Sequence, residues 1–144
     1  EDRDTNIRRI GYVARLLSRN GVGVIVAAIS PYKEIRDEVR RDVEANGAAF
    51  VEVFVQASLD TLVSRDVKGL YKKAIAGEIA NFTGVSDPYE EPLTPEILVS
   101  SDIETVQESA AKIIDHLEEN GLIEPAYHLA QSVEAKFAQF GDLQ

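Results

Sequence analysis

Residues 22–47 read VGVIVAAISPYKEIRDEVRRDVEANG, and this stretch predicts the fold class. It begins with an apolar run, Val22–Ala28, that is rich in β-branched residues and typical of a strand covered on both faces in a parallel sheet. A loop, Ser30-Pro31-Tyr32, then leads into Lys33–Ala45, whose apolar residues recur with helical spacing until Asn46-Gly47 supplies a stop. A strand, a loop and a helix in this order indicate an α/β fold.

The same alternation continues on both sides of this stretch. Asp4–Asn20 has the apolar spacing of an amphipathic helix. Phe50–Val55 is predicted as the next strand, and Ser58 can cap a short helix after it. Ile97–Val99 is predicted as a third strand, before a helix from about Ile103 to Glu119. We therefore expect a mostly parallel sheet flanked by helices, with functional loops at the carboxyl ends of the strands.

The composition fits one globular domain in the cytoplasm. The chain has 144 residues, of which 44% are apolar and 28% charged. No apolar run approaches the roughly 20 residues that cross a bilayer, and no secretory signal pattern is present. The absence of cysteine excludes disulfides and zinc–thiolate sites. A formal net charge of −10 disfavours sequence-independent binding to nucleic acid, which needs a broad basic face.

A second stretch, Ser64–Pro92, predicts a site for an anion. It reads SRDVKGLYKKAIAGEIANFTGVSDPYEEP, and its first ten residues hold four cations and a single acid, Asp66. The four cations are Arg65, Lys68, Lys72 and Lys73. Such a cluster in an acidic protein indicates an anionic small-molecule ligand. Because Gly69 and Gly77 bracket a short helix and permit bending, we expect a mobile lid.

Two loop residues have both a functional and a structural interpretation. Phe82 could stack on a purine, although a lone loop phenylalanine is more often a packing anchor. Ser30 follows the predicted strand, where open α/β sheets contact their ligands, but a serine before Pro31 also suits simple turn geometry. The residue pattern alone leaves both pairs of alternatives open.

Three long blocks together resemble the adenylylsulfate kinase family. They are EDRDTNIRRIG at Glu1–Gly11, IVAAISPYKEIRDEVRR at Ile25–Arg41, and Ser64–Pro92, and the resemblance extends to about Leu122. Members of this family use ATP to phosphorylate the ribose 3′-hydroxyl of adenosine 5′-phosphosulfate, giving 3′-phosphoadenylylsulfate for sulfate assimilation. The resemblance implies a P-loop kinase fold.

The resemblance also implies roles for particular residues. Those implied to contact adenylylsulfate are Arg3, Asn6, Ile29, Ser30, Lys68, Phe82 and Thr83. Those implied on the ATP side of the lid are Arg65, Lys72 and Lys73. The catalytic candidates are Lys68 and Ser30, the latter matching a position that family members can phosphorylate. Without this resemblance, we would interpret Arg3 as a solvent-exposed residue at the start of a helix.

Several family features have no counterpart in the sequence. It contains no G-x-x-x-x-G-K-[ST], so we expect the strand, phosphate-binding loop and acidic residue that the family places before Glu1 to be missing, which leaves the fold N-terminally incomplete and the fragment alone inactive. We predict no metal site built by the protein, and Mg²⁺ would arrive with ATP. Ile75 and Ala80 stand where family members often have basic residues, which lowers the charge of the lid.

The domain and function predictions follow from this resemblance. We expect a kinase-like domain over 1–122 and a C-terminal helical extension over 123–144, with Leu129, Val133 and Phe137 on one side of its helix. The main hypothesis is an adenylylsulfate kinase that binds ATP and adenosine 5′-phosphosulfate, either as a homodimer or fused to ATP sulfurylase. The alternative is an inactive kinase-derived module that senses adenylylsulfate or its phosphorylated product. Neither hypothesis involves nucleic acid or a membrane.

Overall fold

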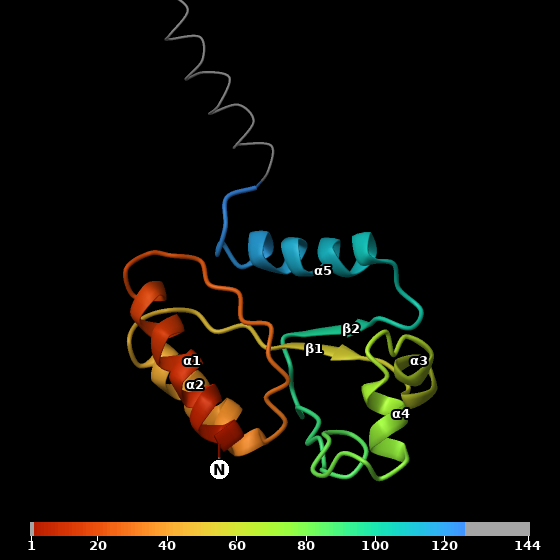
Figure 1. Ribbon diagram of the computed structural model, residues 1–144. Helices are drawn as coiled ribbons and strands as arrows, with labels where there is room; N and C mark the ends of the chain where they lie inside the picture. Colours follow the sequence, from red (N-terminus) through yellow and green to blue (C-terminus); the bar gives the residue numbers. More distant parts are fainter. Residues whose placement is uncertain (1, 126–144) are drawn as a thin grey trace, which may run out of the picture. The chain divides into compact units, whose positions relative to one another are not determined.

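The computed structural model describes residues 2–125 of the chain. The chain divides into two compact units, Glu1–Glu104 and Thr105–Gln144 (Figure 1). The predicted extension at 123–144, with its helix around Val133, falls almost wholly outside the described residues, so its helix stays a prediction. Within residues 2–125, no helix is both long and apolar enough to cross a membrane.

Two long helices begin the first unit and pack against each other. They are α1 (Asp2–Ser18) and α2 (Lys33–Glu44), and both confirm the helices predicted from apolar spacing. Gly11 is buried where they meet, because a Cβ at that position would lie only 2.8 Å from both methyl carbons of Val39. A side chain at position 11 would therefore push the two helices apart.

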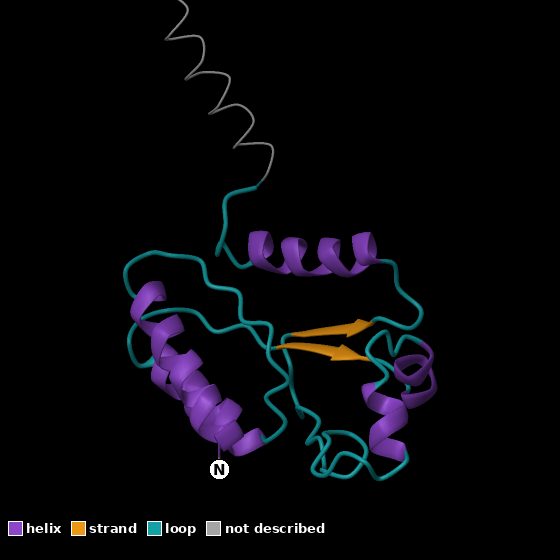
Figure 2. Ribbon diagram, in the orientation of Figure 1, coloured by secondary structure: helices purple, strands orange, loops and turns teal. Residues whose placement is uncertain are grey.

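The sheet of the first unit has two parallel strands, β1 (Val53–Gln56) and β2 (Ile97–Ser100), as Figure 2 shows. Val53 pairs with Ile97, and the register runs to Gln56 opposite Ser100. Both strands were predicted, although β1 begins three residues later than expected because its pairing with β2 begins only at Val53. Along β2 the buried and exposed residues alternate, with Ile97 and Val99 buried.

The structure assigns no strand to Val22–Ala28, so that prediction is wrong for the described chain. Among the described residues this segment pairs with no strand, and the Ile25 side chain is 98% exposed. Apolar β-branched residues favour an extended backbone, but a strand also requires a neighbour whose N–H and C=O groups complete the ladder. The sequence pattern reports the preference for an extended backbone, but it does not report whether a neighbouring strand is present.

Two short helices connect β1 to β2. In α3 (Leu59–Ser64), the Ser58 hydroxyl caps the start by accepting a hydrogen bond from the Thr61 N–H, as predicted. The second helix, α4 (Leu70–Ile75), has Gly69 as its N-cap, and the φ of 67° at Gly69 lies in the left-handed region. The Asp66 carboxylate accepts from the backbone N–H groups of Leu70 and Lys72, so this acid supports the start of α4.

The described part of the second unit contains α5 (Val106–Glu119). Thr105 and Glu108 form a capping box at its start, where each side chain accepts from the other residue's backbone N–H. The helix begins about three residues later than the sequence suggested. The reason is that Ile103 still belongs to a turn, in which its N–H donates to the Ser100 carbonyl.

Candidate functional site

Arg3, near the start of α1, is bound to the loop at residues 81–87, which we call the Phe82 loop. Its Nη1 donates to Thr83 Oγ1 at 2.9 Å and to Asp87 Oδ2 at 2.6 Å, and its Nη2 donates to the Asn81 carbonyl at 2.8 Å. The planar guanidinium suits this forked arrangement. Two predicted substrate residues about 80 positions apart, Arg3 and Thr83, therefore lie together.

Tyr32, in the loop before α2, also binds the Asp87 carboxylate. Its hydroxyl donates to Asp87 Oδ2 at 2.8 Å, so Asp87 accepts from Tyr32 and Arg3 at once. The hydrogen bond to Asp87 is the main cause that raises the pKa of Tyr32. The Asp87 side chain is only 18% exposed, and it joins three segments of the first unit. Neither Tyr32 nor Asp87 was predicted as a site residue.

Ser30 lies in the loop Ser30-Pro31-Tyr32, which we call the Ser30 turn, and its backbone conformation is unusual. Its φ of 44° is in the left-handed region, which residues other than glycine seldom adopt. The next residue, Pro31, is fully buried, and its carbonyl accepts from the Glu90 N–H at 2.9 Å. Ile29, by contrast, is 67% exposed. The turn that the resemblance implies as a substrate contact is thus fixed on one side and open on the other.

Arg36 of α2 is a buried residue at this site that the sequence analysis missed. It is 9% exposed, and its guanidinium donates to the Ser30 carbonyl, the Glu90 carbonyl and Glu52 Oε1. It also lies over the Tyr89 ring, 5.7 Å from the centroid. The available signal was its position, since Arg36 follows the buried Ile35 and therefore flanks the apolar face of the helix.

A second arginine of α2, Arg40, also lies near Glu52 and forms further ion pairs. Arg40 donates to both carboxylate oxygens of Glu96, at 2.7 and 2.8 Å, and its Nη2 lies 3.5 Å from Glu52 Oε2. The pKa of Glu96 is lowered to about 2, chiefly by the hydrogen bond from Arg40. Glu52 therefore stands between two arginines, of which only Arg36 contacts the Ser30 turn.

Phe82 connects its loop to α4. Its ring meets Tyr71 edge to face, with centroids 5.0 Å apart and an angle of 75° between the planes. Its carbonyl accepts from the N–H groups of Val85, Ser86 and Asp87, which makes the loop compact. Phe82 thus serves as a packing residue in this structure, while its stacking on a purine remains a prediction.

The lid segment, Arg65–Gly77, presents its predicted cations to solvent. Lys68, Lys72 and Lys73 are exposed, and within residues 2–125 none of them forms an ion pair. Arg65 is exposed too, but its Nη2 donates to the carbonyl of Ser101, the residue after β2, at 2.8 Å. Of the remaining predicted residues, Asn6 is exposed on α1, one turn beyond Arg3.

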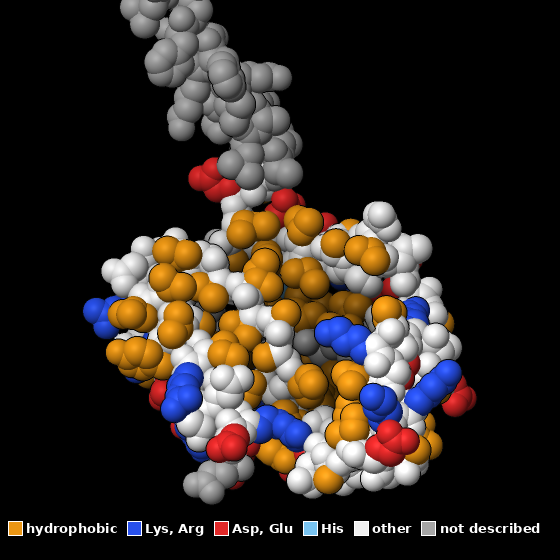
Figure 3. Space-filling model, in the orientation of Figure 1, with side chains coloured by type: hydrophobic (Ala, Val, Ile, Leu, Met, Phe, Trp, Pro, Cys, Tyr) orange, Lys and Arg blue, Asp and Glu red, His pale blue; other side chains and the backbone are white. Residues whose placement is uncertain are grey.

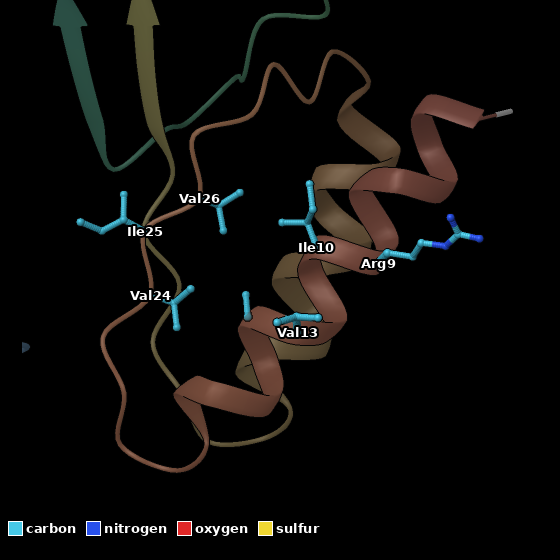
Figure 4. Close-up of a pocket in the computed structure, with 7 residues that line it drawn as sticks. Arg9, Ile10, Val13, Val24, Ile25 and Val26 are labelled. Atoms are coloured by element: carbon cyan, nitrogen blue, oxygen red, sulfur yellow. The ribbon is translucent and has the colours of Figure 1, made fainter.

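A shallow apolar cavity of about 370 Å³ lies elsewhere in the first unit, between α1 and residues 24–26. In Figure 4, Ile10 and Val26 point toward each other across it, while Ile25 points away from the helix. In the view of Figure 3, many hydrophobic side chains lie at the surface, with Lys and Arg side chains among them. None of the predicted site residues lines the cavity. A surface of this kind is typical of a contact with further protein.

The described residues provide no metal centre. Over positions 2–125, no group of three or more His, Cys, Asp and Glu side chains could hold a metal ion. The acids near the site are engaged with cations or backbone N–H groups instead: Asp87 with Arg3, Glu52 with Arg36, and Glu90 with the Lys33 N–H. The arrangement therefore suits the binding of an anion more than that of a cation.

Comparison with known proteins yields one consistent family. A family model described as adenylylsulphate kinase matches residues 1–100. The adenylyl-sulfate kinase of Myxococcus xanthus is 59% identical over 126 residues, which are 88% of this chain and 68% of that protein. A protein of Sorangium cellulosum named "Probable bifunctional SAT/APS kinase 2" is 58% identical over 85% of this chain and 20% of its own length.

A solved structure gives the same result. The APS kinase of Mycobacterium tuberculosis, in complex with AMPPNP and APS, is 44% identical, with a TM-score of 0.76. The match covers 81% of this chain and 67% of that one. The chain thus spans about two thirds of the length of the Mycobacterium and Myxococcus proteins. A TM-score of this size, with this identity, confirms the α/β kinase fold that the sequence predicted.

Proposed function

The chain belongs to the adenylylsulfate kinase family, and on that premise we propose that the full-length protein phosphorylates adenosine 5′-phosphosulfate for sulfate assimilation. In this reaction, a bond forms between the ribose 3′-oxygen and the γ-phosphorus of ATP. The bond from that phosphorus to the β–γ bridging oxygen breaks, and ADP leaves with its electron pair. The proton of the 3′-hydroxyl is released to the solvent. The products are 3′-phosphoadenylylsulfate and ADP.

The observation that carries this proposal is the meeting of three segments. Arg3 binds the Phe82 loop to α1, and Phe82 in turn contacts Tyr71 of α4. The segments implied to hold adenylylsulfate and the segment implied to act as a lid are therefore neighbours in the first unit. Positioning of the two reactants is the main requirement of phosphoryl transfer, because the protein does little covalent chemistry.

Arg3 has donors left for a substrate oxygen. A guanidinium carries five N–H donors, and the loop uses three of them, two on Nη1 and one on Nη2. We assign Arg3 two tasks: it holds the Phe82 loop in place, and it offers its remaining donors to the phosphosulfate. Thr83, Asn6 and the exposed side of the Ile29-Ser30 turn would complete the binding surface for this substrate.

The lid would supply positive charge to the transferred group. Lys68, Lys72 and Lys73 are exposed and form no ion pair within the described chain, so no protein anion has to be displaced before they act. Charge on the moving phosphoryl oxygens is stabilised most by cations already placed around them. Gly69 and Gly77, with φ of 67° and 77°, would allow the lid to bend.

Apart from the lid cations beside the transferred γ-phosphoryl group, we assign the ATP phosphates and their metal to no residue of 2–125. The sequence has no G-x-x-x-x-G-K-[ST] motif, and the described residues hold no cluster that fits Mg²⁺. Magnesium would enter with ATP, bound to its phosphates. The Sorangium relative, named as a bifunctional kinase, supports a fusion to ATP sulfurylase as one arrangement of the full-length protein, and a homodimer is the other arrangement that we propose.

The test is an assay of the full-length protein with ATP, magnesium and adenosine 5′-phosphosulfate. We expect 3′-phosphoadenylylsulfate and ADP to form in equal amounts, as measured by chromatography and mass spectrometry. Binding of adenosine 5′-phosphosulfate without product would instead support the inactive sensing module. If the protein neither bound adenosine 5′-phosphosulfate nor formed the product, the proposed function would be overturned.

A further inference from the structure

We propose that Arg36 is a positioning residue that holds the Ser30 turn in the conformation used for substrate binding. The inference rests on the proposed function for its kinetic consequence. The structural part of the inference is that Arg36 maintains the backbone conformation of Ser30. It does not depend on the proposed function and is tested by a separate measurement.

The Ser30 turn needs support from its surroundings. A φ of 44° is unfavourable for serine, because the Cβ atom crowds the backbone in the left-handed region. Such a conformation persists only when neighbouring groups hold it, and residues of this kind cluster at functional sites. The family resemblance also implies that this turn contacts adenylylsulfate, and Ile29 beside it is largely exposed.

Arg36 is the side chain that holds this turn directly. Its Nη1 donates to the Ser30 carbonyl at 2.8 Å, its Nη2 donates to the Glu90 carbonyl at 2.6 Å, and its Nε donates to Glu52 Oε1 at 2.8 Å. Each of its three nitrogens therefore reaches a different segment. Because the guanidinium is planar and rigid, these bonds fix the Ser30 carbonyl relative to residue 90 and the residue before β1.

Burial makes these bonds stronger than they would be at the surface. Arg36 is 9% exposed, and the Tyr89 ring lies beside its guanidinium. Removing the guanidinium would leave the Ser30 and Glu90 carbonyls without this donor in a partly buried place, which is costly. A lysine would keep the charge but could not reach three segments with one planar group.

The far side of the turn is bound without Arg36. The Glu90 N–H donates to the Pro31 carbonyl at 2.9 Å, and Glu90 Oε2 accepts from the Lys33 N–H at 2.6 Å. These bonds would survive in an Arg36 variant, so α2 and residue 90 would stay in register. We therefore expect the variant to lose the backbone conformation of Ser30 while the rest of the loop remains attached.

The chain offers a matched control in Arg40. It lies one turn further along α2, approaches the same Glu52, and also covers an aromatic ring, that of Phe50. Its other partners are Glu96 and Glu44, and it makes no hydrogen bond to the Ser30 turn. Arg40→Met therefore removes a half-buried ion pair from the same helix without touching the turn.

The experiment compares Arg36→Met, Arg36→Lys and Arg40→Met in the full-length protein. We expect Arg36→Met to raise KM for adenosine 5′-phosphosulfate by on the order of 10- to 100-fold, because misplaced binding groups lose that much. KM for ATP should stay within about twofold, since hydrogen bonds to this turn do not position ATP. Arg36→Lys should fall between wild type and Arg36→Met, and Arg40→Met should keep both values. A folded Arg36→Met with an unchanged KM for adenosine 5′-phosphosulfate would overturn the proposal.

A second readout separates this inference from the proposed function. Carbon-13 chemical shifts of Ser30, obtained by serine-selective labelling, report its backbone conformation without any substrate. We expect these shifts to move toward ordinary values in Arg36→Met and to stay unchanged in Arg40→Met. Unchanged shifts in a folded Arg36→Met, or in Arg36→Lys if Arg36→Met does not fold, would overturn the inference. A wild type without kinase activity would overturn the proposed function alone.

Discussion

The Phe82 loop and the lid segment are neighbours, but they are built in opposite ways. The polar groups of the loop are bound by other segments: Arg3 and Tyr32 share the Asp87 carboxylate, and Arg3 also reaches Thr83. In the lid, Lys68 and the cations near it face solvent and form no ion pair within the described chain. Under the proposed function, the loop would fix the nucleotide and the lid would bring charge to it.

The largest expected effect is on turnover, from Lys68→Ala. Lys68 is exposed, so the free energy of unfolding should not change. If it stabilises the transferred phosphoryl group, kcat should fall on the order of 10²-fold. Steady-state kinetics and urea denaturation of the full-length protein measure the two quantities. Arg19→Ala, which removes an exposed cation from outside the lid, is the control and should leave both unchanged. An equal loss of kcat in the two variants would contradict a special role for the lid.

A smaller effect, on stability, is expected from Asp87→Ala. This change leaves the Arg3 and Tyr32 donors without their shared acceptor, which should cost about 1–3 kcal/mol in the free energy of unfolding. KM for adenosine 5′-phosphosulfate should rise as the Phe82 loop loosens. Tyr32→Phe removes only one of the two donors and should cost less. If Asp87→Ala were as stable as wild type, the Phe82 loop would be held no more tightly than the lid. That result would contradict the comparison of the two segments.

The smallest expected effect is a change of stability at low pH. The pKa of Glu96 in the folded chain is about 2, below its ordinary value of 4.5, because Arg40 binds both carboxylate oxygens. This stabilisation is complete above about pH 4.5 and is lost as the pH falls toward about 2.

Urea denaturation of wild type and Glu96→Gln across that range is the measurement. The two stability curves should differ at neutral pH and converge at acid pH. Asp42→Asn, a change at an exposed acid of α2, the helix that carries Arg40, should parallel wild type. Parallel curves for wild type and Glu96→Gln would contradict the lowered pKa.

Local patterns predicted the helices well, because the information lies within each segment. The spacing of Ile35 and Val43 gave α2, the Ser58 hydroxyl gave the cap of α3, and Gly69 gave the start of α4. The Val22–Ala28 strand was wrong since a strand depends on a partner that no local pattern reveals.

The site divides in the same manner. The lid cations and Phe82 are visible as a cluster in the sequence. Asp87 and Arg36 are not, because their partners lie up to 84 positions away along the chain and only folding brings them together. Its place next to Ile35 puts Arg36 at the border of the apolar face of α2, but charged residues on a helix usually face solvent, so this position alone does not mark it as buried.

The most direct test of the account is a crystal structure of the full-length protein with adenosine 5′-phosphosulfate bound. We predict the adenine against the Phe82 ring, the phosphosulfate near Arg3, and Lys68 on the same side of the nucleotide. A ligand bound away from the Phe82 loop, or a structure with Lys68 and Phe82 on opposite sides of the molecule, would contradict the central claim that the loop and the lid form one site.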